Sequence, residues 1–127
     1  MNFANTTPTF SGTRSIRVDE TTWGALSLHN GPWSATRPLD PTRYQSVQFQ
    51  VFPATAGFNV YVRLENDAKA SFPAIAFGTV PANQWTRVTI PLSQLSPSGT
   101  FFDRIDIGDF TGTTRTYYVD DLRLVGR

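Results

Sequence analysis

The stretch WTRVTIPLSQL, residues 85–95, shows how this chain is built. Val88 and Ile90 alternate with polar residues at the period of two that turns one side of a β-strand toward a core. Pro91 then ends the strand. Because proline fits the first position of a helix, residues 91–95 are predicted to form one helical turn at most.

The same alternation recurs along the chain. Nine Gly and nine Pro divide the 127 residues into short segments rich in Thr, Val, Phe and Tyr. Strands are predicted over residues 14–19, 25–29, 46–52, 58–65, 72–78, 85–90, 104–109 and 116–125. The predicted core consists of Leu26, Leu28, Val47, Phe49, Val51, Val60, Val62, Leu64, Ile75, Phe77, Val88, Ile90, Ile105 and Ile107. About eight such strands predict an all-β, two-sheet antiparallel β-sandwich in a single domain, residues 1–127.

Composition excludes several classes of function. Charged residues make up 17% of the chain and the net charge is +1, so we expect neither nucleic acid nor an anionic membrane as a partner. Cysteine is absent, which excludes disulfides, thiol catalysis and thiolate metal sites. The N-terminal residues MNFANTTPTFSG lack a basic region followed by an apolar run, and no run of about eighteen apolar residues occurs. We therefore expect no signal peptide and no membrane span in this sequence.

The segment WGALSLHNGPW, residues 23–33, indicates a binding face. Trp23 and Trp33 bracket a predicted strand whose outward positions are Ser27 and His29. Exposed aromatic rings beside polar groups suit sugars or other flat, hydroxyl-rich ligands. The alternative is that both tryptophans close the ends of the sandwich, since Trp is usually well buried.

The order of the segments SGTRSIRV, WGALSLHN, YQSVQFQVF, FNVYVRLEN, PAIAFG, WTRVTIPLSQL, FDRIDIGDF and YYVDDLRLV resembles a known family. It is similar to the jelly-roll, galactose-binding-like carbohydrate-binding modules of bacterial polysaccharide-degrading enzymes. The most telling segments, WTRVTIPLSQL and YYVDDLRLV, mark the fold better than the ligand. The resemblance spans nearly the whole chain and implies an extracellular, secreted protein. Such modules often begin with a further strand, for which only residues 1–10 are available, so that strand is expected to be missing or shortened.

The jelly-roll topology implied by the resemblance joins residues 25–29, 104–109, 58–65 and 72–78 in one sheet. Its outward face would carry Ser27, His29, Arg104, Asp106, Tyr61, Arg63, Glu65, Ala74 and Ala76. With Trp23 and Trp33 near the rim, the predicted carbohydrate-binding residues are Tyr61, Arg63, Asp106, Arg104, His29, Glu65, Trp23 and Trp33. The charged groups offer donors and acceptors to hydroxyls, and Tyr61 offers a ring for stacking. The alternative is a ladder of cross-strand ion pairs on a solvated sheet.

The resemblance also implies a structural calcium ion. Asp120 and Asp121 match the C-terminal acidic position that helps to hold this ion in many such modules, and carboxylates are suitable ligands for it. Asp19 or Glu20 would have to replace the N-terminal acidic ligand. The alternative is that one aspartate of the pair faces solvent while the other bonds to backbone in a bulge.

Little in the sequence indicates an enzyme. His29 is the single histidine, and neither a phosphate-binding loop nor a GxSxG motif occurs. Asp106 and Glu65 could serve glycoside hydrolysis, but Arg63 and Arg104 are expected to keep both carboxyls ionised, whereas a general acid needs a raised pKa.

The sequence therefore predicts a non-catalytic module that binds a polysaccharide or oligosaccharide and holds an attached or partner activity near it. The alternative is a structural or adhesion unit. Such a unit would form homo-oligomers by strand pairing or swapping at the sheet edge left bare by the short N-terminus.

Overall fold

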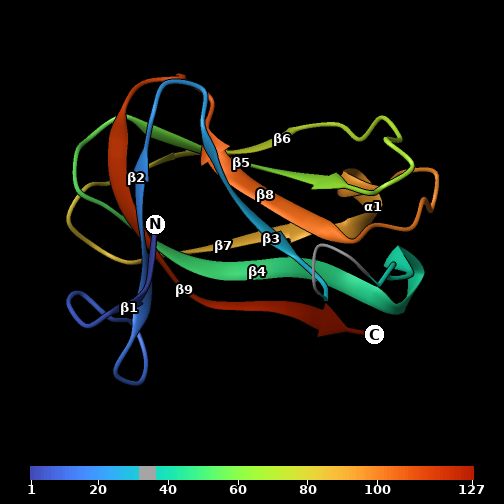
Figure 1. Ribbon diagram of the computed structural model, residues 1–127, viewed down its shortest axis with the longest axis horizontal. Coiled ribbons are helices and arrows are strands. Elements are labelled where there is room, and N and C mark those ends of the chain that lie inside the picture. Colours follow the sequence, from blue (N-terminus) through green and yellow to red (C-terminus); the bar gives the residue numbers. More distant parts are fainter. Residues whose placement is uncertain (32–36) are drawn as a thin grey trace.

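A computed structural model describes residues 1–31 and 37–127. The strands in these ranges are β1 Asn2–Asn5, β2 Ser15–Glu20, β3 Ala25–His29, β4 Tyr44–Pro53, β5 Phe58–Glu65, β6 Ile75–Val80, β7 Thr86–Pro91, β8 Arg104–Asp109 and β9 Arg115–Gly126. Two antiparallel sheets form a sandwich, one with strand order β1-β2-β9-β4-β7 and the other with order β3-β8-β5-β6 (Figure 1). The second order matches the predicted sheet, and the predicted all-β sandwich is confirmed.

The core lies between the two sheets. In β5 the residues alternate strictly between buried and half-buried positions, as the period of two requires. Nearly all the predicted core residues are buried, and each stabilises the fold by roughly 1.5 to 3 kcal/mol when it leaves water. Leu28 and Ile75 are only partly buried, but both pack against this core.

Phe77 is the one wrong assignment in the predicted core, because its side chain is 42% exposed. A β-bulge explains the error. β5 pairs Val60 with Gly78 and the next residue, Tyr61, with Ala76, so Phe77 is an extra residue in the edge strand. The alternation changes phase at this point, and β6 begins and ends later than predicted.

The first strand, which was predicted to be missing or shortened, is present as a short strand. The four residues of β1 pair with β2 through Asn2 opposite Arg17 and Asn5 opposite Ser15. The Asn5 side chain also donates a hydrogen bond of 2.9 Å to Ser15 Oγ. The edge of β2 is therefore covered by the chain's own N-terminus, and the shortened form of the first strand is the one that occurs.

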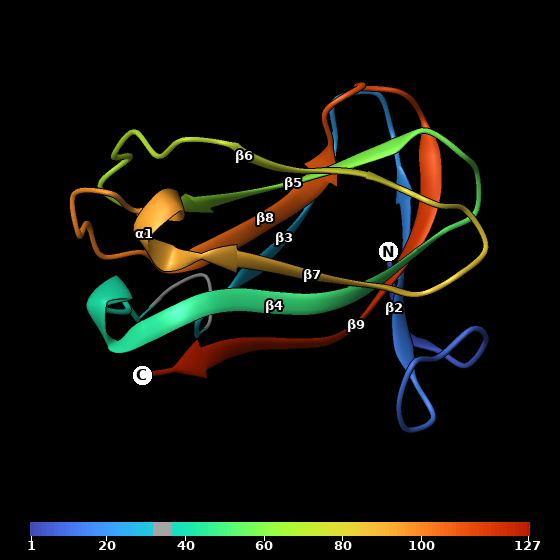
Figure 2. The same ribbon diagram turned by 180° about the vertical axis from the view of Figure 1, so that it is seen from behind.

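The helical turn predicted over residues 91–95 is confirmed as α1, Leu92–Leu95, which buries both of its leucines beneath one end of the sandwich (Figure 2). A 3-10 turn, η1, covers Pro41–Arg43 and precedes β4. No helix within the described ranges is long and apolar enough to cross a membrane.

The bulge assignment makes a testable prediction. Leu64→Ala should lower the free energy of unfolding by about 2 to 5 kcal/mol, because Leu64 is fully buried in β5. Phe77→Ser should change it by no more than about 0.5 kcal/mol, as for other surface substitutions. Urea denaturation followed by circular dichroism measures both values. Similar losses from the two substitutions would show that Phe77 belongs to the core.

Candidate functional site

The outer face of the four-stranded sheet brings most of the predicted binding residues together. Residues in register across β3, β8 and β5 point to the same side of the sheet. One row consists of Ser27, Asp106 and Arg63, and the next consists of His29, Arg104 and Glu65. The prediction that these side chains share one face is therefore confirmed. Ala76 joins the face opposite Tyr61, whereas Ala74 precedes the start of β6.

Arg63, Glu65 and Asp106 form the polar centre of this face. The Arg63 guanidinium lies 3.5 Å from the Asp106 carboxylate and 3.6 Å from that of Glu65. Asp106 is only 3% exposed although it is on the outer face. Its Oδ1 and the Arg63 Nε are buried without a hydrogen-bond partner in the described part of the chain. Each such atom costs free energy, because no hydrogen bond replaces the hydration that it lost on burial.

The two carboxyl groups of the polar centre interact directly. Glu65, when it carries a proton, can donate a hydrogen bond to Asp106, and this bond together with partial burial raises the pKa of Glu65 above its ordinary value. Arg63 and Arg104 both act against this rise, but they do not cancel it. That the two arginines keep the carboxyls ionised stays a prediction.

His29 and Arg104 lie at one border of the face and are engaged by the protein itself. Arg104 forms ion pairs with Asp103, at 3.3 Å, and with Asp67. The Nδ1 atom of His29 lies 2.6 Å from the carbonyl oxygen of Gly31. These two predicted residues therefore flank the polar centre.

Aromatic rings form the opposite border. The half-buried Tyr61 stacks on Phe110 with ring centroids 4.8 Å apart and planes at 25°. Phe110 is 38% exposed and was not among the predicted binding residues. Trp23 is 73% exposed, so the alternative in which it plugs the end of the sandwich is wrong. Trp33 lies outside the described residues.

Trp23 stands at the tip of the turn between β2 and β3. The turn is closed by a hydrogen bond of 2.8 Å from the Gly24 N–H to the Thr21 carbonyl. This geometry gives Trp23 a φ of 61°, a left-handed conformation that is costly for a bulky residue. Such strain is characteristic of functional positions, and here it turns the indole away from the core.

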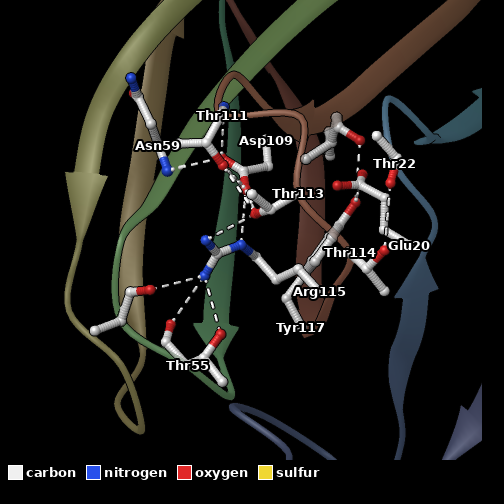
Figure 3. A network of polar contacts seen from close by, with 12 residues as sticks. Glu20, Thr22, Thr55, Asn59, Asp109, Thr111, Thr113, Thr114, Arg115 and Tyr117 are labelled. Atoms are coloured by element: carbon white, nitrogen blue, oxygen red, sulfur yellow. Dashed lines mark hydrogen bonds and ion pairs between the residues drawn. The ribbon is translucent and has the colours of Figure 1, made fainter.

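A buried ion pair supports the loop that carries Phe110. Asp109 and Arg115 end β8 and begin β9, and Arg115 Nε donates to Asp109 Oδ2 at 2.7 Å (Figure 3). Arg115 Nη1 also donates to the carbonyls of Thr55 and Ala56. The N–H and the hydroxyl of Thr111 both donate to the Asp109 carboxylate. These bonds tie residues 110–114 to the end of the sandwich.

The pKa of Asp109 reflects this arrangement. Burial tends to raise it, but hydrogen bonds from Thr111, Arg115 and the Asn59 N–H outweigh burial and hold the pKa below its ordinary value. Asp109 therefore stays ionised, as its pairing with Arg115 requires.

A second buried acid lies beside this pair. Glu20 is 4% exposed, and its Oε1 accepts a hydrogen bond of 2.9 Å from the Tyr117 hydroxyl. Its Oε2 is buried with no partner among residues 1–31 and 37–127. Burial raises the pKa of Glu20 to about 7, and the nearby Asp109 charge adds to the rise.

Sequence reasoning missed this network, although the strand alternation contains the signal. Asp109 follows Ile105 and Ile107 at the spacing of two that marks the core side of β8. Arg115 lies two positions before the core residue Tyr117 on β9, and Glu20 lies two positions after the core residue Val18 on β2. Charged groups at core positions of neighbouring strand ends must pair or lose their charge.

The residues predicted to bind calcium have other partners. Asp120 Oδ2 accepts the N–H groups of Phe10 and Ser11, at 2.8 and 3.1 Å, and its Oδ1 accepts the N–H of Asp121 at 2.7 Å. Asp121 has a φ of 57° and pairs with Arg123 at 3.2 Å. Asp120 thus fastens residues 10–11 to the five-stranded sheet.

Asp19 and Glu20 do not complete a calcium site with these aspartates. Asp19 pairs with Arg17 and accepts from the Thr116 hydroxyl, while Glu20 contacts Tyr117. The described ranges contain no group of three acidic, His or Cys residues placed to hold a metal. Calcium takes six to eight oxygen ligands, and the donors around Asp120 are N–H groups, so these residues as placed do not fit the ion. Calcium binding stays a prediction.

Comparison with known proteins identifies the fold. No family model and no curated sequence matches the chain. A family 29 carbohydrate-binding module variant solved with cellulohexaose is 19% identical with a TM-score of 0.58, covering 88% of this chain and 70% of its own. The family 11 module of a cellulosomal cellulase of Clostridium thermocellum is 18% identical with a TM-score of 0.55, covering 91% and 76%.

An arabinose-bound α-L-arabinofuranosidase is similar as well, at 12% identity and a TM-score of 0.60. The match covers 97% of this chain but only 21% of the enzyme. At such identities the likeness shows the fold alone. The predicted resemblance to jelly-roll carbohydrate-binding modules is therefore confirmed at the level of the fold.

Glu20 makes stability depend on pH. Its pKa is higher in the folded protein than in the unfolded chain, so the folded state binds the extra proton and stability falls as the pH rises from about 4.5 to about 7. Glu20→Gln keeps an acceptor for Tyr117 and has no charge to bury. Thermal unfolding at pH 5 and pH 8 should show a smaller fall in Tm for this variant than for wild type. Equal falls would show that Glu20 does not contribute.

Asp120 allows a test of calcium. Asp120→Ala removes the acceptor of the Phe10 and Ser11 N–H groups and should lower the free energy of unfolding by about 1 kcal/mol. The loss should be the same in EDTA and in millimolar calcium. A Tm that rises with calcium in wild type but not in Asp120→Ala would instead establish the calcium site.

Proposed function

We propose that the protein is a non-catalytic module that binds a polysaccharide or oligosaccharide on the outer face of its four-stranded sheet. The observation that carries the proposal is the stacked ring pair Tyr61 and Phe110 beside the buried, incompletely bonded Asp106. On this face the ring surface lies next to the partly exposed Arg63 and Glu65, which Asp106 supports from a more buried position. Nothing in the packing of the core requires either feature.

The chemistry of this face suits a sugar. A pyranose ring presents C–H groups that stack on aromatic faces and hydroxyls that both donate and accept hydrogen bonds. Asp106 offers an acceptor, Arg63 offers donors, and Glu65 can offer either according to its protonation. The fold shared with carbohydrate-binding modules, one of them solved with cellulohexaose, supports the same assignment.

The proposed role is binding without catalysis. Arg63 pairs with both Asp106 and Glu65, the two carboxylates that a glycoside hydrolase mechanism would have to use, and the solved modules that share this fold are carbohydrate-binding modules. The module would hold an attached or partner activity near its glycan. An extracellular location is proposed on the same ground, since one structural neighbour comes from a cellulosomal cellulase.

Self-association through the sheet edge remains the alternative function. β1 already pairs with β2, which removes the reason for which the sequence suggested it. Mass measured in solution over a range of concentrations separates the two functions. A concentration-dependent oligomer without affinity for any glycan would favour self-association.

Tyr61→Ala tests the proposed face. Loss of its ring from the stack with Phe110 should weaken glycan binding about tenfold or more, or roughly 1.4 kcal/mol. Affinity gel electrophoresis against β-glucan, mannan, xylan and uronate polysaccharides measures the effect.

Tyr118→Ala is the matched control. Tyr118 is also half-buried and packs against a phenylalanine, Phe52, but lies on the five-stranded sheet. Its substitution should leave retardation unchanged. Equal losses from the two variants would contradict the assignment to the four-stranded sheet, and wild type that no glycan retards would contradict the proposed function itself.

A further inference from the structure

Two glycines flank Phe110 in the sequence GDFTG, residues 108–112, and both lie directly beneath an aromatic ring. A Cβ atom added to Gly112 would be 2.5 Å from Cε2 and Cζ2 of Trp23 and 2.6 Å from Cδ2. These nearly equal distances to adjoining atoms of the fused ring system show that the indole lies flat on the Gly112 backbone. Real Cβ contacts are never so short, so any side chain at this position must displace the indole.

Gly108 has the same relation to Tyr61. A Cβ atom there would be 2.7 Å from Cε1, 2.8 Å from Oη and 2.9 Å from Cζ of the tyrosine. Gly108 lies inside β8 and its φ is not in the left-handed region, so backbone conformation does not require glycine. A glycine within a strand weakens the strand and commonly marks the close approach of another group. Here that group is the Tyr61 ring.

The contact with Gly112 covers one face of the Trp23 indole and leaves the other face open. Gly112 is buried beneath the ring, yet the Trp23 residue as a whole is 73% exposed. The Thr22 and Thr114 hydroxyls, 3.4 Å apart, also link the turn that carries Trp23 to the loop that carries Gly112. The two loops lie side by side at one end of the sandwich (Figure 1). The indole is therefore exposed and held in place.

We propose that Gly108 and Gly112 are positioning residues: Gly108 fixes the Tyr61 ring in its stack with Phe110, and Gly112 fixes the exposed Trp23 indole, so that both aromatic surfaces are held in place for the ligand. This inference rests on the proposed function, because it takes the two rings to be the stacking surfaces. Neither glycine needs to touch the ligand. Their contribution is the absence of a Cβ atom at two positions, one two residues before Phe110 and the other two residues after it.

The physical benefit is preorganisation. An exposed tryptophan that samples several rotamers loses that freedom when a ligand orders it, and this loss weakens binding. An indole already seated on Gly112 has lost the freedom during folding. A side chain at Gly112 that displaces the indole should therefore weaken binding by roughly three- to tenfold, even though Trp23 itself is still present.

The chain supplies a control for backbone strain. Gly112 has a φ of 69°, so Gly112→Ala strains the backbone as well as displacing the ring. Gly12 has a φ of 64° and a Cβ atom there would have nothing within 4 Å. Gly12→Ala thus imposes the same kind of strain with no ring to displace. Gly108→Ala is the converse variant, because it displaces a ring without the strain of a left-handed φ.

The experiment combines Gly112→Ala and Trp23→Ala in a double-mutant cycle, with affinity measured by titration calorimetry against the glycan that retards wild type. Gly112→Ala should lower affinity three- to tenfold in wild type and should cause no further loss in the Trp23→Ala background. Gly12→Ala should have no effect, and Gly108→Ala should lower affinity through Tyr61. An equal loss from Gly112→Ala in both backgrounds would overturn the proposal.

Near-UV circular dichroism tests, without any ligand, whether Gly112 holds the Trp23 indole in a fixed position. An indole in a fixed environment gives a tryptophan band, and the difference between wild type and Trp23→Ala isolates that of Trp23. Gly112→Ala should abolish this band and Gly12→Ala should keep it. A band that persists in Gly112→Ala would overturn the proposed seat. If no glycan binds wild type, the proposed function fails, while the spectra still decide whether Gly112 positions Trp23.

Discussion

The ion pair between Asp109 and Arg115 is the interaction on which the aromatic end of this molecule, with Trp23, Tyr61 and Phe110, depends. Both side chains point into the end of the sandwich, where burial of a single charge would be costly. Each is satisfied by further bonds, from Thr111 to the carboxylate and from the guanidinium to the carbonyls of Thr55 and Ala56. A charge pair this well bonded fixes the strand ends and the loop between them.

That loop explains how rings and polar groups come to share one surface. Residues 110–114 carry Phe110 to Tyr61 and place Gly112 under Trp23, while β8 continues from the same point into the polar centre at Asp106. The aromatic border is thus built on a rigid strand end, as precise sites usually are. The turn that carries Trp23 begins after Glu20, the last residue of β2, which is itself fixed by the hydrogen bond from the Tyr117 hydroxyl.

The charged face has two interpretations, a carbohydrate-binding surface and a ladder of cross-strand ion pairs, and the two are compatible. Arg63 does pair with carboxylates across and along the strands, as a solvated ladder would. The pairs are long, however, and they leave Asp106 Oδ1 and Arg63 Nε buried without partners among the residues that the structure describes. A ladder selected only for stability would gain by satisfying these atoms.

Much of the fold follows from the alternation of side chains along each strand. This period of two is a local property of the extended backbone and does not depend on which elements pack against the strand. It placed Val60, Val62 and Leu64 inside and Tyr61 and Arg63 outside, and it could have placed Asp109 inside as well. It failed at Phe77, because a bulge inserts one residue and reverses every later side chain. Gly78, which follows Phe77 and has a φ of 128°, is a local sign of that insertion, since a glycine inside a strand commonly marks a bulge. Where the extra residue falls still depends on how β6 pairs with β5.

The sequence by itself determined the sandwich, its strands and the polar residues that its outer face would carry. Only the tertiary structure decided that the exposed Trp23 indole lies on Gly112, that Arg63 pairs with both Glu65 and Asp106, and that Asp120 binds the N-terminal backbone. Each of these depends on groups distant along the chain meeting at one point. Alternation states the side of a strand on which a residue lies, but contact, burial and pKa arise only where strands and loops converge.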